Sequence, residues 1–109
     1  MIRGILVKPA REPEIVKFKE GYKELQRLVD GYFEMPAVFD DVDIVVNEEG
    51  KFNGSMPNKY LYYQGKLIDV IFGNILVVGH DSEGDTISLT DEQVDKYMKI
   101  LSNERIYIR

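Results

Sequence analysis

The run NILVVG, residues 74 to 79, is the longest apolar stretch of the chain, and Gly73 and Gly79 bracket it. A short, uninterrupted apolar run of this length predicts a strand that is buried on both faces. We therefore expect residues 74 to 79 to form the most buried strand of a sheet. The run is far shorter than the roughly 20 apolar residues that a membrane-spanning helix needs, so no membrane partner is expected.

Several other segments predict strands around this one. Residues 2 to 8 (IRGILVK) contain another unbroken apolar run and should lie inside the sheet, while residues 14 to 18 (EIVKF) should pair with them as a hairpin. Pro36 favours an edge position for a strand over residues 32 to 38, because proline has no N–H to donate to a ladder. Residues 51 to 66 predict a loop, and the pattern does not decide whether the tyrosines within it form a short strand. The remaining expected strands cover residues 42 to 46 and, as a last edge strand, 105 to 109.

Two helices are expected, and the second has the clearest local signal. In residues 20 to 30, apolar residues recur at helical spacing and Gly31 follows as a C-terminal cap. In SLTDEQV, residues 88 to 94, Thr90 and Gln93 have the spacing of a capping box, in which each side chain bonds to the other residue's backbone N–H. This second helix should end near residues 102 to 103.

These elements predict an α+β fold formed by one domain, residues 1 to 109. We expect a single, mostly antiparallel sheet of five to six short strands, with two amphipathic helices packed on one face.

Composition excludes several kinds of activity. The absence of cysteine removes disulfides, thiolate metal sites and thiol catalysis, and it fits a cytoplasmic protein. The formal charge is −5, from 14 basic and 19 acidic residues, so direct nucleic-acid binding is not expected. The acids cluster in DDVD, residues 40 to 43, and in two further turns. One interpretation is that these acidic residues are solvated side chains in turns between strands. The alternative is that they form a surface that imitates the phosphates of DNA.

No catalytic, metal or cofactor site is predicted. His80 is the only histidine, so no histidine pair can form, and a serine nucleophile would need His80 as its base although no nucleophile-elbow motif is present. Beside Asp81 it could act as a general base in a hydrolase, or it could be a structural residue at the end of a strand. Neither GxGxxG nor GxxxxGK[ST] occurs, so no phosphate-binding glycine loop is present.

The stretch NGSMPNKYLYYQGK, residues 53 to 66, is the candidate binding segment. Asn58 and the Lys59 ammonium could hold a phosphate or the edge of a base, and Tyr60 or Tyr62 could stack on a nucleobase. The alternative is that the tyrosine rings only cover the edge of a core. The candidate ligand-binding residues are therefore Asn58, Lys59, Tyr60 and Tyr62, with His80 as an outlying member.

The chain resembles a family of small proteins from bacteriophages, prophages and related bacteria, known as domain of unknown function family 3846. The resemblance runs from residue 1 to about residue 102 and rests on IRGILVKPAREPE, LQRLVDGYFE, NEEGK, MPNK, IDVIFGNILVVG and SLTDEQVDKY, in that order. Where arginine often follows the loop asparagine in that family, this chain has Lys59. The resemblance implies a mobile-element accessory protein and no particular reaction.

Two functions remain as hypotheses. The first is a non-enzymatic phage-type binding protein that sequesters a small nucleotide-like ligand, such as a host defence signal. The alternative is a protein-interaction module or inhibitor that meets a host protein through its acidic loops or through an edge strand, residues 32 to 38 or 106 to 108. Either kind of protein could also be a homo-oligomer.

Overall fold

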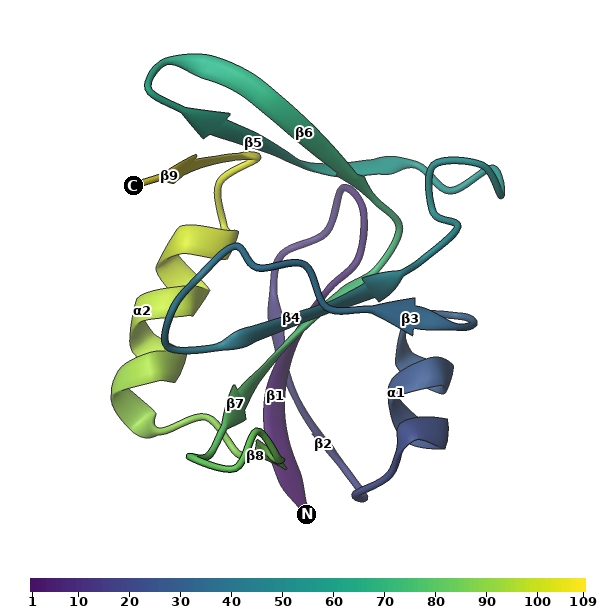
Figure 1. Ribbon diagram of the computed structural model, residues 1–109, viewed down its shortest axis with the longest axis vertical. Coiled ribbons are helices and arrows are strands. Elements are labelled where there is room, and N and C mark those ends of the chain that lie inside the picture. Colours follow the sequence, from purple (N-terminus) through teal and green to yellow (C-terminus); the bar gives the residue numbers. More distant parts are fainter.

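Two helices and nine strands make up the chain in the computed structural model, which describes all residues from 1 to 109 (Figure 1). In chain order they are β1 (Ile2–Val7), β2 (Glu14–Phe18), α1 (Tyr22–Leu28), β3 (Phe33–Glu34), β4 (Asp43–Asn47), β5 (Pro57–Tyr63), β6 (Lys66–Phe72), β7 (Ile75–His80), β8 (Thr86–Ile87), α2 (Asp91–Leu101) and β9 (Arg105–Ile108).

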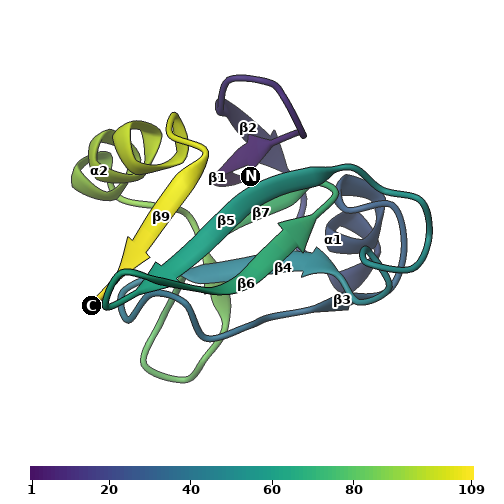
Figure 2. The same ribbon diagram turned by 90° about the horizontal axis from the view of Figure 1, so that it is seen from above.

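The strands form two sheets, so the prediction of a single sheet was wrong while the α+β class is confirmed. The larger sheet is antiparallel, with the order β2-β1-β7-β4-β3, and β8 pairs with β7. The smaller sheet has the order β6-β5-β9 and is mixed, because β9 runs parallel to β5. Seen from above in Figure 2, the smaller sheet lies across the larger one, with α2 beside β9.

The second sheet was missed because β6 lacks a clear strand pattern. Its first four residues are all exposed, Leu67 and Ile68 among them, and a bulge breaks the alternation of the β5–β6 ladder. The two strands are joined by Gln64 and Gly65, whose φ angles of 49° and 79° lie in the left-handed region that such two-residue hairpin loops require.

The centre of the molecule is β7, as the apolar run predicts. Residues 75 to 78 are all 0% exposed, because β7 lies between β1 and β4 and both of its faces are covered. Side chains alternate between the faces of a strand. Ile75 and Val77 therefore face one hydrophobic cluster, and Leu76 and Val78 face another.

The two helices lie on opposite faces of the larger sheet, not on one face as predicted. Leu25 and Leu28 of α1 pack in the cluster that contains Leu76, whereas Tyr97 and Leu101 of α2 pack in the cluster that contains Ile75. A central strand that is apolar on both faces exposes two apolar surfaces, and each needs its own cover. Neither helix is long and apolar enough to cross a membrane.

The local signals around α2 are confirmed. Thr90 Oγ1 accepts a hydrogen bond of 3.1 Å from the backbone N–H of Gln93, and Gln93 Oε1 accepts one of 3.0 Å from the N–H of Thr90. The strand expected over residues 32 to 38 is shorter, since only Phe33 and Glu34 pair with β4.

The smaller sheet is joined to the rest of the molecule by its inner face. Leu61, Ile71 and Ile106 belong to the same hydrophobic cluster as α2. Next to them, the buried Asn58 side chain donates hydrogen bonds to the carbonyl oxygens of Val7 and Gly73, at 2.9 and 2.8 Å. This packing brings the start of β5 beside the β1–β2 turn and the end of α2.

Candidate functional site

The start of β5 borders a groove of about 500 Å³, called here the Lys59 groove. Its walls come from three segments that are distant in the chain. Arg11 and Glu12 belong to the β1–β2 turn, Asn58 to Tyr60 belong to β5, and Glu104 follows α2. The groove is within the range of roughly 300–1,000 Å³ that is usual for small-molecule sites.

Lys59 is the exceptional residue of this groove. It is only 5% exposed, yet its ammonium has no hydrogen bond and no carboxylate within ion-pair distance. Burial lowers the pKa of Lys59, and the more distant carboxylates of Glu104 and Glu12 oppose that change only in part. The ammonium is partly desolvated but still accessible from the groove, so an anion that reaches it would be bound favourably.

Asn58 and Tyr60 border the same groove in different ways. Both N–H groups of the Asn58 amide are used in the bonds to Val7 and Gly73, so this residue holds the groove wall in place. Tyr60 is half-buried. Its backbone N–H donates 2.9 Å to the carbonyl of Glu104, which fixes the two sides of the groove to each other.

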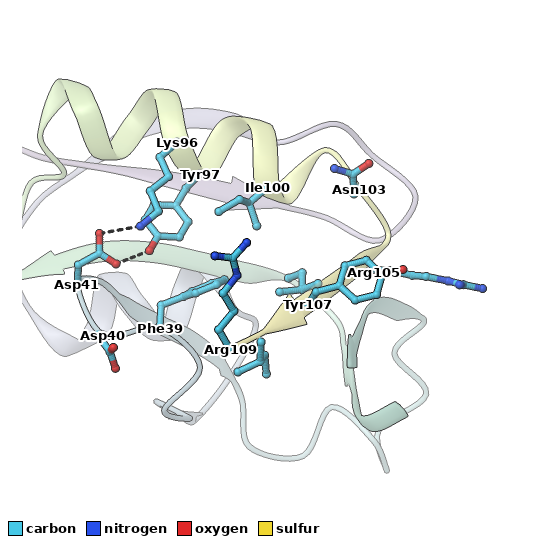
Figure 3. A pocket seen from close by; sticks show the side chains of 12 residues that line it. Phe39, Asp40, Asp41, Lys96, Tyr97, Ile100, Asn103, Arg105, Tyr107 and Arg109 are labelled. Carbon is cyan, nitrogen blue, oxygen red and sulfur yellow. Dashed lines mark hydrogen bonds and ion pairs between the residues drawn. The ribbon is translucent and has the colours of Figure 1, made fainter. Parts of the chain in front are cut away.

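A larger recess of about 780 Å³, the α2–β9 pocket, lies between α2, the segment before β4 and all five residues from 105 to 109 (Figure 3). Phe39, Ile100 and Ile108 supply apolar walls. In Figure 3 the Arg109 side chain extends across the middle of this pocket toward α2. No hydrogen bond or ion pair engages its guanidinium. The sequence indicated an edge strand here but gave no sign of the pocket.

Asp41 is held at one end of this pocket by α2. The Tyr97 hydroxyl donates a hydrogen bond to Asp41, and Lys96 Nζ lies 3.5 Å from its other oxygen. Burial by itself raises the pKa of Asp41, but the Tyr97 hydrogen bond and the Lys96 charge outweigh it and leave that pKa below its usual value. Burial, and then the bond to Asp41, raise the pKa of Tyr97 far above that of a free tyrosine.

A family model described as a domain of unknown function, DUF3846, matches residues 2–102. The chain belongs to this family. Neither a curated protein nor a solved structure matches it. Membership in DUF3846 assigns no reaction and no ligand, so the function of this DUF3846 chain has to be argued from its own residues.

Tyr62 does not line the Lys59 groove. It lies with Tyr107 and Arg105 on the opposite face of the smaller sheet from the buried Leu61 and Ile106. The Tyr62 and Tyr107 rings are 5.6 Å apart, and the Arg105 guanidinium carbon is 5.3 Å from the Tyr62 ring centre. Tyr62 is therefore already stacked within the protein.

His80 is separate from the other candidate residues. It ends β7 in the larger sheet, and its Nδ1 lies 3.1 Å from Asp43 Oδ1, so its partner is Asp43 and not the adjacent Asp81. About a third of each of these two side chains is exposed. The pair lines neither of the two recesses of this DUF3846 protein. No group of three histidine, cysteine, aspartate or glutamate side chains gathers closely enough to hold a metal ion.

Proposed function

We propose that this DUF3846 protein is a cytoplasmic, non-enzymatic binding protein of a phage or other mobile element. Its ligand is a small nucleotide-like molecule, with the chemistry of a host defence signal, and the Lys59 groove is the site. The observation that carries the proposal is the Lys59 side chain, which is buried along most of its length and ends in an ammonium that reaches the groove and has no partner.

The anionic part of the ligand meets Lys59 and Arg11. Lys59 supplies a partly desolvated charge, so its attraction to a phosphate is screened less than that of a fully exposed lysine. Arg11 is exposed at the mouth of the same groove and adds a guanidinium, which suits the oxygens of a phosphate.

The rest of a nucleotide matches the remaining walls. Tyr60 alternates with Lys59 along β5 and shares the face of Arg105, so its half-buried ring can stack on a base only at the rim of the groove. Glu12 and Glu104 would repel a bare anion, but their carboxylates accept hydrogen bonds from ribose hydroxyls or an exocyclic amine. A ligand with an anionic end and a donor-rich end therefore fits better than inorganic phosphate.

Calorimetric titration with linear and cyclic nucleotides tests the proposal. We expect at least one to bind saturably and to raise Tm. At a free concentration 100 times Kd, the stabilisation is about 2.7 kcal/mol, which corresponds to roughly 10–20 °C for a domain of this size. No heat and no shift in Tm across the whole panel would overturn the proposal.

Matched variants locate the site. Lys59→Met should abolish binding, whereas Lys66→Met, which removes an exposed lysine of β6, should leave it unchanged. Tyr60→Leu should weaken binding by about 1–3 kcal/mol, and Tyr22→Leu on α1 should not. Equal binding by the Lys59 and Lys66 variants would place the ligand elsewhere.

A further inference from the structure

The outer edge of β9 is an unused hydrogen-bonding edge. β9 pairs only with β5, and the Tyr60 N–H donates to the Glu104 carbonyl. Because peptide groups alternate sides along a strand, those of Ile106 also face β5, and those of Arg105 and Tyr107 face away from it. Their N–H and C=O groups are free to pair with another strand.

The α2–β9 pocket lies along this free edge. All five residues from Arg105 to Arg109 line it, although their side chains alternate between the two faces of the strand. Its apolar walls, Phe39, Ile100 and Ile108, are partly buried and pack against the main hydrophobic cluster. An inward-facing apolar side chain of an added strand would therefore extend the existing core.

We propose that β9 is a docking edge, and that its occupant is an extended segment of another protein in which apolar residues alternate and an acidic residue faces Arg109. The protein would then have two binding sites: the Lys59 groove for a small ligand, and the separate β9 edge for a protein partner. Main-chain hydrogen bonds to residues 105 and 107 supply affinity, and the pocket supplies specificity, as in other strand-addition sites.

Charge selects the acidic partner. Arg109 has no partner and reaches into the pocket, and Lys96 lies on the α2 wall (Figure 3). The carboxylates of the pocket stand at its other end, where Asp41 is already bound to Tyr97 and Lys96. A carboxylate on the added strand therefore meets an unpaired guanidinium, with which it can form two parallel hydrogen bonds.

A second copy of this chain is a poorer occupant. If residues 105 to 109 of two copies paired antiparallel over their whole length, Arg105 of each copy would stand opposite Arg109 of the other. Like charges that face each other directly across a ladder are destabilising. The edge is thus better suited to an acidic strand than to its own sequence, RIYIR.

The test is a selection from a phage-displayed library of random eight-residue peptides, with Tyr107→Pro as the counter-selection. This change removes the outward N–H of residue 107 without removing a bond to β5. We expect wild type to enrich alternating apolar peptides with one acidic residue. Fluorescence anisotropy should then give binding at least ten-fold weaker for Tyr107→Pro and within three-fold of wild type for Tyr107→Ala, which keeps the N–H and removes the ring.

A second variant keeps the test decisive if Tyr107→Pro fails to fold. Arg109→Glu should reverse the selected charge, so that basic residues replace acidic ones in the enriched peptides. The proposal is overturned if no peptide is enriched by wild type, or if the selected charge is the same for wild type and Arg109→Glu. It is also overturned if a folded Tyr107→Pro variant binds as tightly as wild type.

Discussion

The side-chain amide of Asn58 donates a hydrogen bond of 2.9 Å to the carbonyl oxygen of Val7, and this bond ties the smaller sheet to the larger one. The same amide donates to Gly73, at the turn between β6 and β7. One buried side chain thus connects β5, the end of β1 and the β6–β7 turn.

Asn58→Ala should destabilise the fold by about 1–3 kcal/mol, because two buried carbonyl groups lose their donors. Urea unfolding measures the change. Asn103→Ala, which loses one long, exposed hydrogen bond to Lys99, should stay within about 0.5 kcal/mol of wild type. If the two variants are equally stable, Asn58 is not the connection between the sheets.

Lys59→Met should raise stability at neutral pH by at most about 1 kcal/mol, since it replaces a partly desolvated charge with an apolar side chain of similar length. The pKa of Lys59 is lowered in the fold, so the unfolded chain binds more protons between that pKa and lysine's ordinary value. The free energy of unfolding of the wild type should therefore increase as pH rises from the lowered pKa of Lys59 to the ordinary lysine pKa. The Lys59→Met variant should not show this increase. A variant that is less stable than wild type at every pH would contradict a cost from the buried charge.

Tyr97→Phe should cost about 1 kcal/mol at neutral pH, because Asp41 loses a hydrogen bond. The pKa of Asp41 is lower in the folded chain than in the unfolded chain. The stability that this difference contributes is therefore present at pH values above the ordinary aspartate pKa, and it is lost as pH falls through the lowered pKa of the folded state. Urea unfolding between pH 2 and 7 should show the two proteins converging in acid. Tyr22→Phe, at an exposed tyrosine, is the control.

The same tyrosine predicts a loss of stability in alkali. The pKa of Tyr97 is raised in the fold, so above the ordinary tyrosine pKa of about 10 the unfolded chain releases a proton that the folded chain keeps. Wild type should lose stability more steeply than Tyr97→Phe between pH 10 and 11. Parallel decline of the two proteins would show that Tyr97 ionises equally in both states.

Thr90→Ala should destabilise the protein by about 1 kcal/mol, because it removes the capping-box hydrogen bond to the N–H of Gln93. Thermal unfolding measures it. Ser82→Ala, in an exposed turn without a side-chain hydrogen bond, should leave Tm nearly unchanged. A similar Tm for both variants would mean that α2 is held by its packing alone.

The elements that could be predicted depend on short-range patterns. The apolar run of β7 indicated its burial on both faces, and Thr90 and Gln93 marked the start of α2. The alternation in RIYIR indicated the strand β9 but not its parallel neighbour β5, which lies far earlier in the chain. β6 was not predicted, because its exposed Leu67 and Ile68 carry no periodic signal.

The candidate site was predicted only in part, because only some of its residues stand out in the local sequence. Composition singled out Asn58, Lys59 and Tyr60, which share one groove, but it also included Tyr62 and His80, which lie elsewhere. Arg11 and Glu104 were not anticipated as their neighbours, since nothing local to either residue indicates a site.

By itself, the sequence determined the elements with a clear apolar pattern or cap, β7 and α2 above all, because periodicity and capping act between residues a few positions apart. Only the tertiary structure decided that the chain makes two sheets, that its helices cover opposite faces, and that Lys59 is buried without a partner. Each of these depends on which apolar faces meet across long stretches of chain, and that choice is made by the packing of the whole molecule.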